Sequence, residues 1–458
     1  MESDVARIAE AMTDRSAAGL AAAVNRLIKS GELVAGTQLP TVRVLATALG
    51  TSPTTVNTAW RSLIRIGAVR TDGRNGSFVA EPRHAGWPSR FWRIASGAGE
   101  FAMDLSAGVP DPALLPPLQH LFAGIHRSPH LSGYLDPPVL PELERHIRLD
   151  WQHIGEPESI TVVDGSLDAI DRLVTSLVSL GDRVIVENPT FPPFLDLLDL
   201  IGAETIAVAT DTEGMRPDEL RAALAGLTGS RPVAVLLQPR AHNPTGASMG
   251  RPRAAELASV LRAAPFCVVV EDDHAGDIAT AEQVSLAAHL PERTIRIRSF
   301  SKSHGPDLRL AAIGGPAALI EPINARRNLG PAWSSRLLQR LLVDMLDDER
   351  CVATVARART TYAERRQALV DALAVRGISV HARDGFNLWV DVAHERDALV
   401  VLATHGIGAA PGRPFLPGPN GGDHLRVTTA LLPTEHASTV ADALADAATP
   451  HPNGAIHR

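Results

Sequence analysis

Short apolar runs that alternate with helical stretches dominate the sequence beyond residue 100 and restrict its fold more than any other feature. Such runs occupy residues 183–186, 205–208, 233–237 and 266–270. Strands that are apolar on both faces must be covered on both faces, and parallel strands need a helix to connect them. The pattern therefore predicts an α/β domain with a mostly parallel sheet, in which ligands bind beyond the carboxyl ends of the strands.

The chain has 458 residues, too many for one ordinary core, and this length predicts two or three domains. No stretch approaches about 18 uninterrupted apolar residues, so no membrane span is expected. The N-terminus is charged and amphipathic and lacks the apolar segment of a signal peptide. Cys267 and Cys351 are far apart and have no metal-ligand neighbours in the sequence. This cysteine usage favours a reducing, cytoplasmic environment and argues against a metal site.

Three stretches near the N-terminus have helical spacing. The first covers residues 20–28, and the second follows Pro40. The third starts with Ser52 at the N-cap and Pro53 at the first helical position, which both favour the start of a helix. A helix–turn–helix pair of this kind places its second helix in the major groove of DNA.

Residues 68–70 and 77–80 flank a turn-rich segment and predict a β-hairpin. Three helices and a hairpin make a winged helix-turn-helix, although other small helical domains share this order. Residues 1–83 hold ten Arg and Lys against seven Asp and Glu, whereas the remainder holds 34 against 44. A basic head on an acidic body fits DNA contact by the head alone, although so small an excess also arises by chance.

The segment 31–79 closely resembles the DNA-binding domain of the GntR family over all three helices and the wing. This resemblance implies double-stranded DNA as a partner. The contacts that it implies are Arg43 on a phosphate, Thr54, Thr55 and Asn57 at the groove, and Arg74 on the wing. Pro53 stands where many members carry an arginine, so one expected DNA contact is missing. The DNA-binding domain is expected over 1–83 and a linker over 84–100, which is rich in proline, glycine, arginine and aromatic residues.

Lysine is scarce, since the chain contains only Lys29 and Lys302. Lys302 lies in SFSKSHGPDLRL, directly after a strand-like run. A lysine condenses with an aldehyde to form an imine, and pyridoxal 5'-phosphate is the commonest cofactor of this kind. Ser299 and Arg309 bracket the lysine and could bind the phosphate. An exposed structural lysine is the alternative, but a chain that uses arginine elsewhere has kept a lysine here.

Four further motifs suit the same cofactor, and each also has a plain structural explanation. Asp272 follows an apolar run and could pair with a protonated pyridine nitrogen, or could cap a helix. Asn243 in HNPTG could reach the phenolate oxygen, or could only form a turn. Gly165 and Ser166 stand between a strand and a helix and could bind a phosphate, or could only form a turn of small residues. Phe191 could stack on the ring, or pack in the core.

The order of these motifs, GS, ENPTF, HNPTG, EDDH, SFSK and a late LRV, closely resembles fold-type I aminotransferases from residue 101 to the end. The resemblance implies an α/β domain over 101–458 with a smaller C-terminal α/β subdomain. It implies that Lys302 holds pyridoxal 5'-phosphate as an internal aldimine, and that Arg426 binds the carboxylate of an incoming amino acid. It also implies a homodimer in which Tyr134 reaches the phosphate of the neighbouring subunit.

Three positions depart from the pattern of that family. His274 stands where a tyrosine usually contacts the ring oxygen, and an imidazole can still donate a hydrogen bond there. Val139 and Glu144 replace a usual glycine and arginine, so the segment between subunits is expected to differ in shape.

The combination of a GntR head with an aminotransferase-like domain is the architecture of the MocR family of regulators. The resemblance implies a DNA-binding regulator that senses a small amine or amino acid through its aldimine, with little or no physiological turnover. Two alternatives stay open. One is a working aminotransferase with an accessory DNA-binding domain, and the other is a regulator whose effector is pyridoxal phosphate itself.

Overall fold

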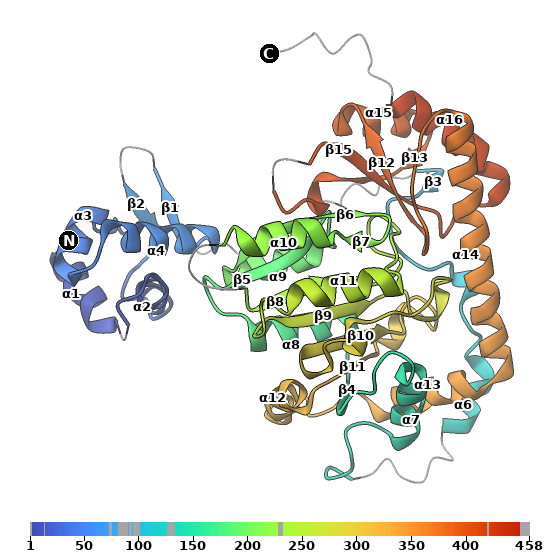
Figure 1. The fold of residues 1–458 in the computed structure, drawn as a ribbon, viewed down its shortest axis with the longest axis horizontal. Helices are drawn as coiled ribbons and strands as arrows, with labels where there is room; N and C mark the ends of the chain where they lie inside the picture. The colour runs from blue at the N-terminus through green and yellow to red at the C-terminus, as the bar shows by residue number, and fades with distance from the viewer. Residues whose placement is uncertain are drawn as a thin grey trace.

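The computed structural model describes residues 2–12, 14–72, 76–80, 90, 94, 101–125, 133–227, 232–418 and 421–448. Within these ranges a small N-terminal domain precedes a large domain with a central sheet and a C-terminal subdomain (Figure 1). Of the predicted linker the structure describes Arg90 and Ile94, and Arg74 of the predicted wing lies outside the described residues. Among the described helices, none is both long and apolar enough to cross a membrane.

Helices and one hairpin build the N-terminal domain. Its elements are α1 (Glu2–Ala11), α2 (Ala17–Lys29), α3 (Val42–Leu49), α4 (Pro53–Arg65), β1 (Val69–Thr71) and β2 (Ser77–Val79). The side chains of Ser16, Thr41 and Ser52 cap the starts of α2, α3 and α4. The three predicted helices and the hairpin are therefore present. The sequence pattern did not predict α1 as a helix, and its Ile8 is fully buried in the same core.

The central sheet has eight strands in the order β4-β11-β10-β9-β8-β5-β6-β7. The strands are β4 (Ser159–Val163), β5 (Arg183–Asn188), β6 (Glu204–Asp211), β7 (Gly214–Met215), β8 (Ala234–Leu237), β9 (Val268–Asp273), β10 (Thr294–Ser299) and β11 (Ala311–Gly315). The five strands from β10 to β6 pair in parallel, whereas β11 is antiparallel to both of its neighbours and β7 is antiparallel to β6. The predicted mostly parallel sheet is confirmed.

Helices cover both faces of this sheet because its strands are apolar on both sides (Figure 1). One core holds α8 (Ser166–Leu177), α9 (Pro192–Ile201) and α12 (Ala317–Asn328) against Val184 and Val186 of β5. The opposite core holds α10 (Pro217–Ala225) and α11 (Arg251–Leu261) against Ile185. A third core joins α6 (Gln119–Ile125), α7 (Pro141–Trp151) and α13 (Arg336–Asp347).

The C-terminal subdomain follows the long helix α14 (Glu349–Val375). Its other elements are β12 (Asn387–Val392), α15 (Glu395–Thr404), β13 (Ile407–Gly408), β14 (Ala410–Pro411), β15 (Asp423–Thr428) and α16 (Ala437–Ala448). Strand β3 (Met103–Asp104) pairs in parallel with β13. The chain then continues to residues 106–108, which line the cavity described in the next subsection. Short 3₁₀ turns occupy Pro112–Leu114, Gly276–Ile278, Leu286–Ala288, Pro291–Arg293, Pro306–Leu308, Arg413–Phe415 and Thr434–His436.

Candidate functional site

A cavity of about 430 Å³ lies at the carboxyl ends of β9 and β10, where polar side chains from distant parts of the chain meet. This volume is in the range of small-molecule sites, and its place is the usual one for ligands of an α/β sheet. Nine residues that the sequence predicted for a cofactor or its substrate line the cavity: Ser166, Phe191, Asn243, Asp272, His274, Ser299, Lys302, Arg309 and Arg426.

Sequence reasoning missed other parts of the cavity wall. These residues include Ile94, Ser106, Gly108, Val109, Gln238, Ser301, Phe386, Asn387 and Phe415. Most of them are small or apolar, or lie in segments that carry no motif, so no local signal distinguishes them. Gln238 is the exception, because it follows β8 directly and precedes the predicted Asn243 by five positions.

The amine of Lys302 is enclosed by the cavity wall. Its Nζ atom donates a hydrogen bond to the Gly108 carbonyl and lies 5.7 Å from the centroid of the Phe386 ring. The pKa of the amine is lowered to about 8, first because burial disfavours the charged form and then because Arg426 carries the same charge. About a tenth of the amine is therefore neutral near pH 7, which is the form that attacks an aldehyde.

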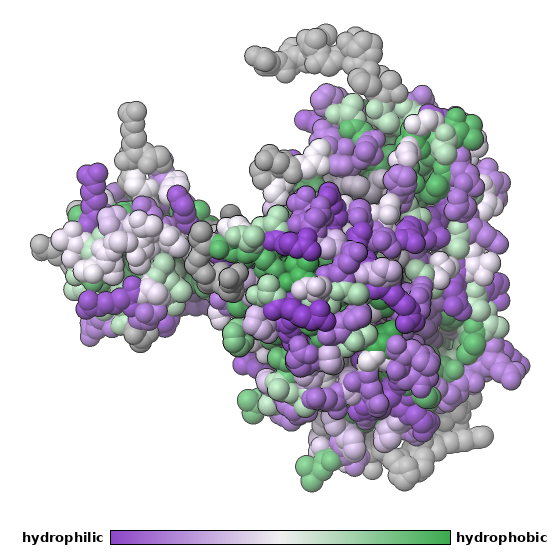
Figure 2. Space-filling view, viewed as in Figure 1, coloured by the Kyte–Doolittle hydropathy of each residue, from purple (hydrophilic) through white to green (hydrophobic). Residues whose placement is uncertain are grey.

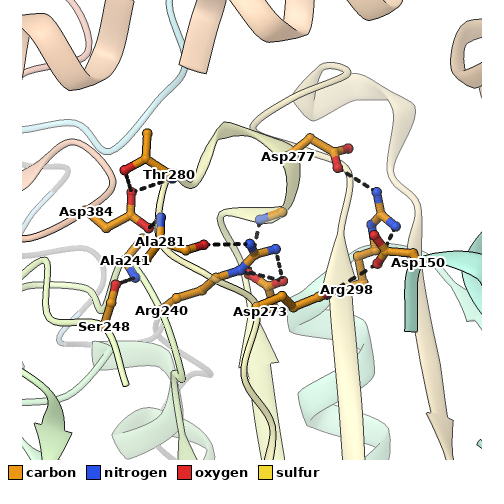
Figure 3. Close-up of polar contacts among 12 residues, drawn as sticks. Asp150, Arg240, Ala241, Ser248, Asp273, Asp277, Thr280, Ala281, Arg298 and Asp384 are labelled. Carbon is orange, nitrogen blue, oxygen red and sulfur yellow. Dashed lines mark hydrogen bonds and ion pairs between the residues drawn. The ribbon is translucent and has the colours of Figure 1, made fainter. Parts of the chain in front are cut away.

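Asp272 and Asp273 are neighbours in β9, so their side chains point to opposite faces of the sheet. Asp273 accepts a 2.6 Å hydrogen bond from Arg240 Nη2, and Figure 3 shows this pair beside the ion pairs of Arg298. Asp272 Oδ1 is buried and has no hydrogen-bond partner among the described residues. Burial raises the pKa of Asp272 to about 7, and the charge of Asp273 adds to the effect. Of the two carboxylates, Asp272 is the one available to a cationic ligand atom.

Gln238 holds two predicted site residues together. Its Nε2 atom donates to Asp272 Oδ2 at 2.9 Å, and its Oε1 atom accepts from the Asn243 backbone at 2.8 Å. Its own backbone N–H donates to the buried Glu187 at 2.8 Å. Burial raises the pKa of Glu187 to about 8, so this carboxyl is mostly protonated at neutral pH. The network orients the carboxylate of Asp272 without neutralising it.

One end of the cavity is built for an anion. Helix α8 begins at Ser166, and Gly165 precedes it with a φ of 99°. A Cβ atom on Gly165 would lie 2.8 Å from Arg309 Nη2, so only glycine lets the guanidinium approach this turn. Arg309 Nη2 donates to the Asp164 carbonyl at 2.7 Å. The guanidinium, the helix N-terminus and the hydroxyl of Ser299 can together bind a phosphate.

Arg426 enters the cavity from β15 of the C-terminal subdomain and is 3% exposed. It donates to the Ser106 carbonyl and contacts Asn243 Oδ1 at 3.5 Å. Burial lowers its pKa to about 10, and Asp104 partly offsets this effect. A buried guanidinium with no carboxylate paired to it in the described structure can bind a ligand carboxylate.

The structure does not support the expectation that His274 donates a hydrogen bond to a ring oxygen. His274 Nε2 lies 2.8 Å from the carbonyl oxygen of Ala241, which can only accept. The Nε2 atom therefore carries the hydrogen. Burial lowers the pKa of His274 to about 4, so the ring is neutral and its Nδ1 atom can only accept. Phe191, by contrast, lies at the N-cap of α9 with its side chain in the cavity wall.

Tyr134 does not line the described cavity of its own chain. It is 88% exposed beside the fully exposed Leu135, and its ring centroid lies 6.1 Å from that of Trp333. An exposed aromatic and leucine side by side are typical of a surface that another protein covers. The two unusual residues nearby have local roles, since Val139 is buried and Glu144 forms a 2.8 Å ion pair with Arg148. The role of Tyr134 in a neighbouring subunit stays a prediction.

In the folded structure, side chains that can bind a metal lie close to Cys351, although the sequence pattern did not indicate such neighbours. His120, Asp348 and Cys351 place their donor atoms within 4.8 Å of one another. Asp348, however, already caps α14 by accepting from the backbone of Arg350 and Cys351. Burial, followed by the hydrogen bond with Asp348, raises the pKa of the thiol to about 11, which disfavours the thiolate that a metal needs. We assign no metal to this cluster.

The predicted DNA-contacting residues lie at the starts of α3 and α4. Arg43, Thr54 and Asn57 are exposed. Thr55 is half-buried, and its Oγ1 atom lies 2.9 Å from the Oγ atom of the N-cap Ser52. Thr55 therefore supports the cap of α4, and it is less available to DNA than the sequence suggested.

Models of two protein families match separate parts of the chain. The model of bacterial regulatory proteins of the gntR family matches residues 16–79. The model of class I and II aminotransferases matches residues 101–444. The crystal structure of a kynurenine aminotransferase from Pyrococcus horikoshii superposes with a TM-score of 0.71 at 20% identity, covering 80% of this chain and 95% of that chain. That likeness shows the fold of the large domain.

Two curated relatives extend over most of the chain. The vitamin B6 salvage pathway transcriptional repressor PtsJ of Salmonella typhimurium is 36% identical over 91% of this chain and 95% of its own length. The pyridoxine biosynthesis transcriptional regulator PdxR of Corynebacterium glutamicum is 25% identical over 76% of this chain and 77% of its own length.

Proposed function

From the premise that this chain belongs to the MocR-type transcription regulators, in which a GntR-family domain is fused to an aminotransferase class I/II domain, we propose that it binds pyridoxal 5'-phosphate and that this ligand sets its affinity for DNA. One observation carries the proposal: a single cavity presents Lys302, Asp272 and Arg309 together. An amine, a carboxylate and an anion site are what the aldehyde, the pyridine nitrogen and the phosphate of this molecule require.

The residues of the cavity fit this ligand group by group. Asp272 Oδ1, buried and without a partner, suits a protonated ring nitrogen. The proposed contacts are Lys302 for the aldehyde, Asp272 for the ring nitrogen, Asn243 for the phenolate oxygen, Phe191 for the ring face, and Gly165, Ser166, Ser299 and Arg309 for the phosphate. When bound, pyridoxal phosphate supplies an electron-withdrawing ring, and the protein supplies the neutral amine that holds it.

The names of two relatives support the ligand itself as the signal. One relative is a repressor of vitamin B6 salvage, and the other is a regulator of pyridoxine biosynthesis. A regulator that binds the end product of such a pathway reports directly on its supply. The domain that meets DNA is proposed to be the N-terminal one, through Arg43, Thr54, Asn57 and Arg74. Since its partner is DNA, we expect the protein to act in the cytoplasm.

Arg426 favours a second candidate, in which a small amine or amino acid is the effector. Its buried guanidinium faces the same cavity as Lys302 and would bind an amino-acid carboxylate. Such a ligand would react with the lysine-bound cofactor, and a complete transamination would make the protein an aminotransferase with an accessory DNA-binding domain. Release of a keto acid at a sustained rate would identify that activity.

Fluorescence anisotropy with cofactor-free protein tests the proposal. A labelled duplex from upstream of the gene next to the one that encodes this protein is titrated with the protein, first without pyridoxal phosphate. The titration is then repeated at a concentration of pyridoxal phosphate at which the absorbance of the bound ligand no longer increases. We expect the dissociation constant for DNA to change at least fivefold, in the range typical of coupled sites. Lys302→Ala should bind the duplex but respond weakly. Equal DNA affinity in both conditions would exclude pyridoxal phosphate as the signal, and a response only after an amino acid is added would favour the second candidate.

A further inference from the structure

Helix α9 lies between the cavity and the N-terminal domain. Its N-cap residue, Phe191, and its first residue, Pro192, line the cavity that contains Lys302. Its ten residues span about 15 Å. Pro192, Pro193, Phe194, Leu195 and Leu198 are buried against the sheet, so the helix is held along its length.

The middle of α9 holds the linker. Asp196 accepts from the Arg90 backbone N–H at 3.3 Å, and Asp199 accepts from Arg90 Nη1 at 2.5 Å. The Arg90 side chain is 24% exposed and that of Asp196 is 9% exposed, so this pair is partly shielded from water. Four residues further on, Ile94 is half-buried and lines the same cavity as Lys302. The described linker residues thus contact both α9 and the cavity.

The far end of α9 meets the N-terminal domain. The helix ends at Ile201, and its C-cap residue, Gly202, has a φ of 77°. A Cβ atom at Gly202 would lie 2.4 Å from Ile66 Cγ2 and 2.5 Å from Leu180 Cδ1, so these side chains pack directly on its backbone. Ile66 is the C-cap residue of α4, the helix expected to enter the DNA groove. Leu180, from the large domain, also packs against the core of the N-terminal domain.

In the view of Figure 2 the described parts of the two domains approach each other over a narrow stretch, and hydrophobic residues lie beside it on the large domain. A small contact of this kind leaves the relative position of two domains sensitive to small shifts. A packed helix moves as a unit, so a shift at one end of α9 reaches its other end.

We propose that α9, with Arg90 and Ile94, couples the cavity to the DNA-binding domain. A ligand that contacts Phe191 and Ile94 changes the positions of α9 and the linker together. The change reaches the end of α4 through the contact of Gly202 with Ile66 and Leu180. This proposal rests on the proposed function, because it assigns the route by which an occupied cavity alters DNA binding.

The test measures coupling, defined as the ratio of the DNA dissociation constants with and without pyridoxal phosphate. Arg90→Ala removes the side-chain anchor of the linker, and Leu180→Ala removes the contact at the junction. We expect each variant to bring the ratio to within about twofold of one. The affinities for pyridoxal phosphate and, in its absence, for DNA should change by less than about threefold, because neither residue belongs to the proposed ligand or DNA contacts.

Two control variants remove the same types of side chain, an arginine and a leucine, at positions that do not contact the described linker residues or the junction. Arg251→Ala removes an arginine that forms an exposed ion pair with Glu282, and Leu200→Ala truncates a side chain of α9 that is 75% exposed. Both should keep the ratio of the unaltered protein. If pyridoxal phosphate changed the DNA affinity of the unaltered protein, and Arg90→Ala and Leu180→Ala kept that same ratio, the assigned route would be wrong.

Hydrogen exchange separates this route from the proposed function. Pyridoxal phosphate should slow amide exchange at residues 194–202 and 62–68 of the unaltered protein, and Arg90→Ala should abolish the effect at residues 62–68. This pattern would support the route even if pyridoxal phosphate did not change the affinity for DNA. An unchanged DNA affinity would overturn only the proposal that pyridoxal phosphate is the signal. Bound pyridoxal phosphate without any change at residues 62–68 would overturn the route.

Discussion

Gln238 Nε2 donates a hydrogen bond of 2.9 Å to Asp272 Oδ2, while Oε1 of the same side chain accepts one of 2.8 Å from the Asn243 backbone. All three residues are buried, with Gln238 2% exposed and Asp272 1% exposed. Buried polar groups need a partner, so the amide satisfies two groups that water cannot reach. It also aims the free oxygen of Asp272 at the cavity.

Replacing Gln238 with alanine should therefore affect both stability and the ligand. We expect Gln238→Ala to lower the free energy of unfolding by about 2–4 kcal/mol, because two buried groups lose their partner. The affinity for pyridoxal phosphate should fall about tenfold as Asp272 loses its orientation. Urea unfolding and absorbance titration measure the two effects. Gln283→Ala is the control, since the half-buried Gln283 bonds to Asp150 at 3.3 Å; equal effects of both variants would refute a positioning role for Gln238.

The second prediction concerns the lysine in the cavity. Lys302→Ala should abolish the visible absorbance of the lysine-bound cofactor while leaving the circular dichroism of the fold unchanged. Lys29→Ala should leave the absorbance intact, because Lys29 is exposed at the end of α2. An unchanged spectrum in Lys302→Ala would contradict the assignment.

The third prediction is that affinity for pyridoxal phosphate rises with pH. Binding needs a neutral amine at Lys302 and favours an ionised carboxylate at Asp272, and their pKa values are about 8 and about 7. Raising the pH deprotonates both groups, so the affinity should increase from about pH 6 to about pH 9 and then level off. Absorbance titrations at a series of pH values measure this curve. Asp272→Asn should bind more weakly and lose the part of the rise near pH 7, and a fall in affinity over this range would contradict the prediction.

The fourth prediction separates two kinds of DNA contact. Arg43→Ala should weaken binding to specific and random duplex alike and reduce the salt dependence, because a phosphate contact carries no base information. Asn57→Ala should lower specificity at one or two base pairs by about 1–3 kcal/mol. Anisotropy titrations with both duplexes measure the difference. If both variants lost affinity equally for both duplexes, the orientation assigned to α4 would be wrong.

The fifth prediction concerns Tyr134, which is exposed in the single chain. Its hydroxyl is expected at the phosphate of a second subunit, so the protein should sediment as a homodimer at micromolar concentration. Tyr134→Phe should remain a dimer and bind pyridoxal phosphate about tenfold more weakly, as expected for a hydrogen bond to a charged group. A monomer that still binds the ligand would contradict this arrangement.

The sequence predicted the elements whose signals are local. The strand-like runs, the N-cap Ser52 and Pro53 at the first helical position identify elements over a few residues, and the structure contains them. The motif residues from Ser166 to Arg426 line one cavity because they lie at the start of a helix, at the end of a strand or in the loops that follow the strands, or enter from the C-terminal subdomain. Their ligand contacts stay predictions.

Other features depend on contacts with distant parts of the chain, and the sequence pattern does not reveal these contacts. Gln238 acts on a carboxylate 34 positions away, and Ile94 reaches the cavity from the linker. The Ala241 carbonyl determines which ring nitrogen of His274 carries the hydrogen, and any residue at position 241 would supply this backbone group. Helix α1 was not predicted, although its segment is amphipathic, because ten residues rarely form a stable helix alone; the neighbouring core, in which Ile8 is buried, stabilises it.

With pyridoxal phosphate bound at Lys302 as proposed, the enclosed position of this lysine would also allow distances within the protein to be measured by fluorescence. With only one other lysine side chain, exposed on α2, borohydride reduction would leave a permanent fluorescent pyridoxyl group at Lys302 and allow a dye to be attached at Lys29. Energy transfer between these two native positions would report the distance between the cavity and the N-terminal domain as DNA is added, without an engineered attachment site.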